Sequence, residues 1–111
     1  MADIPKQTIV ENDGLSVTYA AAANGDTIAA FDVRDEFIVK TAGTAVDVTL
    51  SSNQNCDQGF DHNHVESIGA TAEYHFRLKP AARWKNATTG KLEITYSVLT
   101  AVTVACIRHP R

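Results

Sequence analysis

The stretch that decides the fold class is residues 70–79, ATAEYHFRLK, in which apolar and polar side chains alternate. Such period-two alternation is typical of a β-strand that buries one face and exposes the other. The face expected to be buried consists of Ala70, Ala72, Tyr74, Phe76 and Leu78. The opposite face consists of Glu73, His75, Arg77 and Lys79. The stretch therefore predicts a half-solvated strand of an antiparallel sheet.

The same alternation recurs along the chain, and helical periodicity is almost absent. Alternating runs cover residues 15–21, 46–50 and 92–98, a more fully buried strand is expected at 37–39, and a strand rich in β-branched residues is expected at 100–107. Six or more short strands with polar connections are typical of a sandwich or small barrel. The sequence therefore predicts an all-β fold, a single small antiparallel β-sandwich or barrel-like domain.

Turn residues separate these runs. Asn24-Gly25-Asp26 predicts a turn, because Asn and Gly tolerate positive φ. The segment 86–90, NATTG, predicts another turn, and the strands at 92–98 and 100–107 are expected to form a hairpin.

The chain has room for one domain, since it contains 111 residues. Residues 1–7 are expected to form an extended N-terminal arm, because the Ile4-Pro5 pair favours an extended backbone. Residues 8–111 are expected to form the β-sandwich domain. A long polar loop is expected at residues 51–64, and loops of this length are usually functional or mobile.

The bulk composition favours some partners over others. The net charge of −3 is accompanied by no basic cluster, so nucleic acid is not an expected partner. No apolar stretch is long enough to predict a membrane helix, and no signal peptide is apparent at the start, so synthesis and retention in a cytoplasm are expected. In that compartment Cys56 and Cys106 are expected to be thiols.

The polar loop is the best candidate for a metal site. It offers His, Cys and carboxylate ligands within nine residues, at Cys56, Asp57, Asp61, His62 and His64. No further ligands stand at the spacing of a tetrahedral zinc site, so a polar surface loop without metal or cofactor is favoured. The acidic stretch 32–36, DVRDE, lacks the spacing of a calcium loop and is predicted to be a solvated connector.

No arrangement of residues predicts catalysis. The chain contains no nucleophile elbow and no glycine-rich phosphate loop, so an enzyme is not expected. Trp84, the only tryptophan, follows Arg83. Trp84 is either an exposed binding residue, since Trp and Arg are frequent at interfaces, or a plug for one end of the sandwich.

Read in order, the chain resembles the small head decoration (capsid cement) proteins of tailed bacteriophages. The resemblance covers nearly the whole chain. At the acidic stretch 32–36 the chain departs from the pattern of these proteins. The segments that carry it are 4–7, 15–22, 37–40, 46–50, 56–62, 80–84, 90–97 and 102–107. The most individual of these is CDQGFDH at 56–62.

The resemblance implies a virion protein on the capsid exterior that binds major capsid protein subunits and stabilises the shell. No cofactor is expected, and a trimer at three-fold or quasi-three-fold positions is one option for self-association. The residues expected to contact the capsid are Ile4, Pro5, Lys6, Gln7, Phe60 and Trp84. The arm could add a strand to a capsid sheet. The alternatives are another head-completion or tail component, or a stand-alone β module that binds a ligand or metal.

Overall fold

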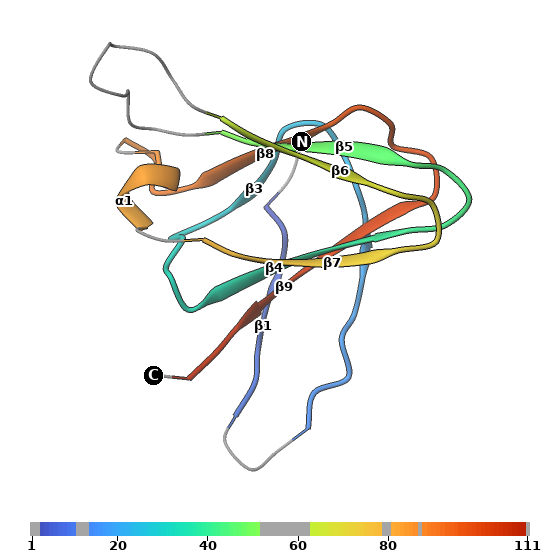
Figure 1. Ribbon diagram of the computed structural model, residues 1–111. Helices are drawn as coiled ribbons and strands as arrows, with labels where there is room; N and C mark the ends of the chain where they lie inside the picture. The colour runs from blue at the N-terminus through green and yellow to red at the C-terminus, as the bar shows by residue number, and fades with distance from the viewer. Residues whose placement is uncertain (1–2, 11–13, 52–62, 79–80, 87, 111) are drawn as a thin grey trace.

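The computed structural model describes residues 3–10, 14–51, 63–78, 81–86 and 88–110, which form two packed β-sheets. The first sheet has the order β3-β8-β5-β6, with bounds Asp26–Ile28, Leu92–Tyr96, Val46–Leu50 and His64–Ile68. The second sheet has the order β1-β9-β4-β7, with bounds Lys6–Thr8, Val102–Arg108, Asp35–Thr41 and Glu73–Arg77. Figure 1 shows the first sheet as the upper layer and the second sheet as the lower layer. The predicted all-β fold is confirmed.

Two short elements complete this description. Strand β2, Ala20–Ala21, pairs with β9 beside β1, so that both short strands share one edge of β9. The pairing of β1 with β9 is parallel, whereas β2, β4 and β7 are antiparallel to their neighbours. A single helical turn, α1, spans Ala81–Trp84 between β7 and β8.

Alternating side chains of both sheets fill the space between the layers. The side chains of Val46, Val48 and Leu50 on β5 are almost fully buried, as the alternation predicts. Phe37 on β4 packs against Phe76 on β7, with ring centroids 5.8 Å apart. The core consists of aliphatic side chains together with aromatic rings, and burial of these groups supplies most of the favourable free energy of folding.

The expected hairpin of the last two strands is not formed. Strand β8 lies in the first sheet and β9 in the second, so the connection between them crosses from one layer to the other. Ala101 in this connection has a φ of 58°, a left-handed conformation that suits a tight reversal. Strand β8 alternates because it buries one face against the opposite sheet, whereas β9 is buried on both faces, and neither pattern reveals which strands are hydrogen-bonded.

The strand expected at residues 15–21 is formed only at β2. Its alternation has a different cause, because Leu15, Val17 and Tyr19 pack on the outer face of the second sheet. They contact a small apolar cluster made by Ile38, Ala105 and Ile107. The segment therefore covers the sheet without joining it.

The turn predicted at Asn24-Gly25-Asp26 is confirmed, and the same device recurs at the start of β4. The carboxylate of Asp26 accepts a hydrogen bond from the Ala23 backbone N–H at 3.0 Å, and that of Asp35 accepts one from the Asp32 N–H at 3.0 Å. Both aspartates begin a strand and are buried, at 3% and 0% exposure. The prediction that 32–36 is a solvated connector is wrong at Asp35 for this reason.

Candidate binding surfaces

The N-terminal segment lies against the domain and connects the two sheets. Asp3 forms a parallel bridge with Thr27 on β3, and the Ile4 N–H donates to the Thr27 carbonyl at 2.8 Å. Lys6–Thr8 then pairs with β9 of the other sheet. The boundary expected after residue 7 therefore falls inside β1, and residues 3–7 close one side of the sandwich.

The expected contact residues of this segment differ in accessibility. Ile4 is 6% exposed and belongs to the main core, whereas Pro5 is exposed. Gln7 is half-buried, and its side chain forms a reciprocal pair with the backbone of Thr18, in which both hydrogen bonds are 2.7 Å long. Pro5 is thus the member of this set that offers its side chain to a partner without a rearrangement.

Lys6 is held by a buried carboxylate. Its Nζ lies 3.0 Å from the Oδ2 of Asp35. Arg108 binds the same carboxylate with both ends of its guanidinium, donating from Nε to Oδ1 at 2.7 Å and from Nη2 to Oδ2 at 2.9 Å. Burial raises the pKa of Asp35, but the hydrogen bonds from Arg108 and Lys6 outweigh it and hold the pKa below its usual value. The two cations therefore keep Asp35 ionised inside the protein.

The carbonyl of Ala30 completes this buried charge cluster. It accepts hydrogen bonds from Lys6 Nζ and Arg108 Nη2, both at 3.0 Å. Ala30 has a φ of 48°, which costs a non-glycine residue on the order of 1 kcal/mol. The backbone of this turn thus adopts an unfavourable conformation in which the Ala30 carbonyl oxygen accepts hydrogen bonds from both cations.

The remaining two expected contact residues lie elsewhere. Phe60 lies outside the described residues. Trp84 is 5% exposed and belongs to the main core, and the Arg83 guanidinium lies 4.5 Å from its ring centroid. Of the two interpretations of Trp84, the plug at one end of the sandwich agrees with this placement. Contact of these residues with a capsid stays a prediction.

The metal candidates of the polar loop are mostly outside the described part of the chain, which holds none of Cys56, Asp57, Asp61 and His62. His64 is the first residue of β6, and its Nε2 lies 3.0 Å from a Glu66 carboxylate oxygen. Among the described residues no group of three His, Cys, Asp or Glu side chains is placed to hold a metal ion.

Of the two cysteines, only Cys106 lies in the described part of the chain. It is a free thiol buried on β9, and burial raises its pKa to about 12. Such a thiol is unreactive in the folded protein.

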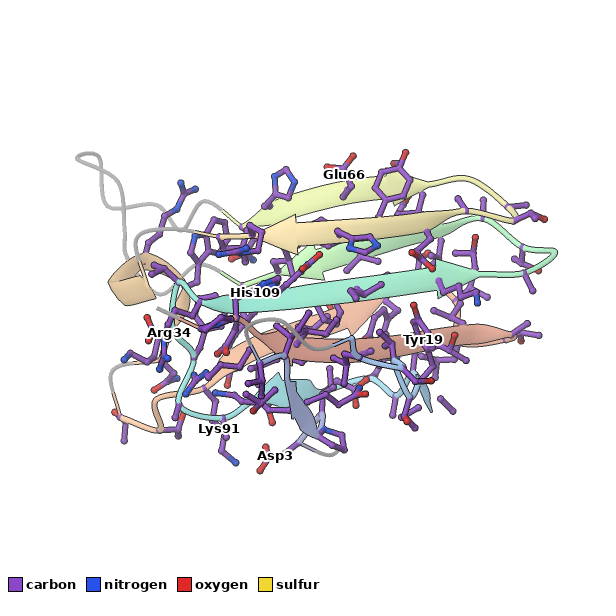
Figure 2. All side chains as sticks on the ribbon, turned by 90° about the horizontal axis from the view of Figure 1, so that it is seen from below. Asp3, Tyr19, Arg34, Glu66, Lys91 and His109 are labelled. Atoms are coloured by element: carbon purple, nitrogen blue, oxygen red, sulfur yellow. The ribbon has the colours of Figure 1, made fainter. Side chains whose placement is uncertain are left out.

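A groove of about 600 Å³ lies beside the N-terminal segment on the outer side of β3 and β8. Asp3 and Lys91 form an ion pair across part of it, with Nζ 3.0 Å from Oδ1. Its other polar walls come from Thr27, Thr95 and Glu93. Figure 2 shows Asp3 and Lys91 together at the border of the molecule opposite Glu66. The groove could hold a small polar ligand through hydroxyl and charged groups.

A network of titratable groups covers the outer face of the second sheet. His75 lies between two carboxylates: its Nε2 is 2.8 Å from Glu73, and its Nδ1 contacts Glu36. Glu36 also binds His109 Nε2 at 2.6 Å. The hydrogen bond to Glu73, followed by that to Glu36, raises the pKa of His75 above its usual value.

Sequence reasoning missed the buried charge cluster and this histidine network. Asp35 and Glu36 are visible in the sequence only as an acidic run, and their partners Arg108 and His109 stand 73 residues further along. The available signal was the pairing of an acidic strand start with a basic strand end, since two antiparallel strands place such residues side by side.

No protein-family description, no curated protein and no solved structure matches this chain. Its class is therefore defined by the fold and surfaces only. It is a small β-sandwich with one side closed by its N-terminal segment. No helix in the described ranges has the length and apolar character needed to cross a membrane.

Proposed function

We propose that this protein is a virion structural protein that decorates the outer surface of a phage capsid and stabilises it by binding major capsid protein subunits. The observation that carries the proposal is the resemblance of the sequence to small head decoration proteins over nearly its whole length. Several segments that carry it, 37–40, 46–50 and 102–107, lie within strands β4, β5 and β9. The resemblance thus concerns the framework of the sandwich.

Stabilisation follows from mass action. A module that binds only the assembled shell lowers the free energy of that state, and each bound copy adds its own contribution. A rigid β-sandwich loses little conformational entropy on binding, because its surface is already ordered. The chain is well suited to this role, since its two sheets pack on one shared core that fixes their outer surfaces relative to each other.

The N-terminal segment contributes to the capsid contact through its exposed face. If it were to leave β9 and add a strand to a capsid sheet, Lys6 would leave the carboxylate of Asp35, which lies 3.0 Å away, and Ile4 would leave the core. Both changes oppose release. The docked segment, with Pro5 exposed beside the groove, is therefore the favoured contact surface.

Co-sedimentation with phage capsids tests the proposal. We expect the protein to co-sediment with mature expanded capsids and not with immature ones, and cryo-electron microscopy of the particles should then show added density on their exterior. Absence of binding to both forms would refute the proposal. Density inside the head or on the tail would instead support the alternative of a head-completion or tail component.

Two variants locate the contact. Pro5→Asp changes an exposed side chain and should weaken co-sedimentation while the melting temperature stays unchanged. Removal of residues 1–7 should abolish binding but also lower stability, because it deletes Ile4 and Lys6. If both variants bind capsids with the affinity of the full chain, the N-terminal segment is not part of the contact.

The groove favours a second candidate function, a stand-alone module that binds a small polar ligand. Its hydroxyl and charged walls resemble those of sites that take sugars or polyols, although none of the described residues that line it is aromatic. Calorimetric titration with a panel of monosaccharides distinguishes this candidate. Saturable binding that is lost in Lys91→Ala would support it.

A further inference from the structure

Strand β7 is the outermost strand of the second sheet. It pairs with β4 on one side, and no other strand of the described residues pairs with it on the other side. In Figure 2, β7 and β6 run along one border of the molecule. An edge strand presents backbone N–H and C=O groups that are ready to pair with another strand.

The register of β4 and β7 determines which backbone groups face outward. The Thr41 N–H donates to the Ala72 carbonyl at 2.8 Å, so residues two and four positions along β7, Tyr74 and Phe76, also belong to hydrogen-bonded pairs with β4. The intervening residues Glu73, His75 and Arg77 therefore direct their N–H and C=O groups away from β4. Their side chains lie on the outer face of the sheet.

Two of these residues, Glu73 and Arg77, are complementary to each other when the strand is reversed, whereas His75 faces the His75 of the second copy. In an antiparallel pair of two β7 strands centred on His75, Glu73 of one copy lies directly opposite Arg77 of the other, and the same pair occurs again across the two-fold axis. We propose that a second copy of this chain is the partner of β7, and that the two copies form a dimer with one continuous sheet. Opposite charges at directly facing positions favour this register.

The charge pattern continues across the existing sheet. On the same face β4 places Lys40 opposite Glu73 and Glu36 opposite Arg77. A row through the dimer therefore reads Lys40 and Glu73 from one copy, then Arg77 and Glu36 from the other, with alternating sign at every step. At the centre, each His75 lies between two carboxylates of its own chain, Glu36 and Glu73.

The inner face of β7 supports the same pairing. Tyr74 is 37% exposed although its neighbour on β4, Val39, is fully buried. In the proposed register Tyr74 lies opposite Phe76 of the second copy, and aromatic cross-strand pairs stabilise antiparallel sheets. The dimer would therefore cover the exposed part of the Tyr74 ring.

The neighbouring edge strand β6 contains no Lys or Arg, so a pair of two β6 strands cannot place a Lys or Arg opposite a carboxylate. An antiparallel pair of β6 strands centred on Glu66 would place two carboxylates opposite each other, which is unfavourable. Its His64 and Glu66 share the face of Ile68 and so point toward the inner side of the sandwich at the edge. Inward-pointing charged residues are a known protection of edges against pairing. The two-fold contact is thus assigned to β7 and not to β6.

Charge reversal tests this proposal in the isolated protein, independently of capsid binding. We expect the wild-type protein to be a dimer in sedimentation velocity, and both Glu73→Arg and Arg77→Glu to be monomers, because each variant places like charges opposite each other twice. An equimolar mixture of the two variants should form a heterodimer, since every facing pair is then opposite in charge. Melting curves establish that both variants are folded.

Each charge-reversal variant also meets a like charge on β4 of its own chain, Lys40 or Glu36. That intramolecular effect is the same alone and in the mixture, so it cannot produce recovery on mixing. A wild-type protein that is monomeric up to about 1 mM, or that forms the trimer expected from the family resemblance, would overturn the proposal. A mixture that stays monomeric would also overturn it, as would single variants that remain dimeric.

A backbone variant provides a second test. His75→Pro removes the outward N–H of the central residue, whereas the bonds between β7 and β4 are made by its neighbours. His75→Ala removes the same imidazole but keeps the N–H and is the matched control. We expect at least a tenfold weaker dimer for the proline variant and a change of less than threefold for the alanine variant. Equal dimerisation of the two would contradict the edge pairing.

Discussion

The side of the sandwich that carries β1, β2 and β3 is closed by the chain itself, whereas the side that carries β6 and β7 ends in two strand edges. On the closed side the N-terminal segment passes from Thr27 to β9 and inserts Ile4 into the core. On the open side no described strand continues either sheet beyond β6 or β7. The same layers therefore end in two different ways.

The two sides also use charge differently. Asp35 on β4 is fully buried and bound by two cations, one of which is Lys6 from β1 on the closed side, so loss of one partner leaves a charge with less compensation in a medium of low polarity. The groups on the open side remain largely in water: the side chains of His75, Glu73 and His64 are 42–45% exposed. Exposed ion pairs contribute little to stability, but they can determine register and partner.

Removal of the buried carboxylate should have the largest effect on stability and is the strongest test of the closed side. Asp35→Ala leaves Arg108 and Lys6 without their carboxylate partner, and we expect it to lower the free energy of unfolding by about 3 kcal/mol. Urea denaturation at neutral pH measures this change. Asp47→Ala, at an exposed position of β5, is the control and should change stability by less than about 0.5 kcal/mol.

The pH dependence sharpens this test. The pKa of Asp35 is lower in the folded protein than its unfolded value of about 3.9, so its contribution is complete above that value. The contribution is lost as the pH falls through the folded pKa. Asp35→Asn, which does not titrate, should therefore show a shallower loss of stability in acid than the wild-type protein. Parallel acid-denaturation curves would contradict the assignment.

A smaller loss is expected when the N-terminal segment loses its charge. Lys6→Met keeps the aliphatic stem but removes the ion pair with Asp35, which keeps Arg108 as a partner. We expect a cost of about 1.5 kcal/mol in urea denaturation, since hydrogen bonds to charged groups contribute this much. Lys91→Met, which removes the exposed pair with Asp3, should cost less than about 0.5 kcal/mol. Equal losses of stability in the two variants would mean that the Lys6–Asp35 pair stabilises the fold no more than the exposed Asp3–Lys91 pair.

The sequence predicts the strands better than their arrangement. Alternation at 46–50 and 92–98 correctly predicts half-buried strands, because burial of one face is a local property. It cannot tell whether a neighbour lies beside the strand or across the core, so the hairpin of β8 and β9 was expected in error. It also cannot distinguish residues 15–19, which pack on a sheet, from a paired strand.

The buried charge cluster could not be predicted for a related reason. Burial of Asp35 depends on two cations, Lys6 and Arg108, that come from the opposite ends of the chain. The pattern of β7 is different, because EYHFR is visibly complementary to its own reverse in the sequence. What the sequence does not show is that this strand is an edge, and that depends on the topology of the whole sheet.

Histidine titration sharpens the description of the open side. The pKa of His75 is raised first by the hydrogen bond to Glu73 and next by that to Glu36. A raised pKa stabilises the fold below the unfolded value of about 6.5, and this contribution is lost as the pH rises through the folded pKa. At pH near 5.5 the free energy of unfolding of the wild-type protein should thus exceed that of His75→Ala by less than about 1 kcal/mol. At pH near 9 the two free energies of unfolding should be equal.

Nuclear magnetic resonance of the imidazole protons provides the direct measurement. Glu73→Gln removes the charge of the partner that raises the pKa most, so the titration midpoint of His75 should move down in this variant. An unchanged midpoint would mean that the Glu73 contact is not formed in solution.

The smallest effect is expected when a single hydroxyl is removed at the contact that joins the two sides. Tyr19, in the segment that leaves the closed side, donates its hydroxyl to Glu73 on β7 at 3.2 Å, and Lys40 lies 5.0 Å from its ring centroid. Tyr19→Phe removes only the hydroxyl and should cost about 0.5 kcal/mol, because the acceptor remains hydrated. Tyr19→Leu also removes the ring beneath Lys40 and should cost about 1–2 kcal/mol in the same urea titration. If the two variants lower the free energy of unfolding by the same amount, the hydroxyl makes the whole stabilising contribution of Tyr19. The segment would then be attached to the open side by the hydrogen bond to Glu73 and not by packing of the ring.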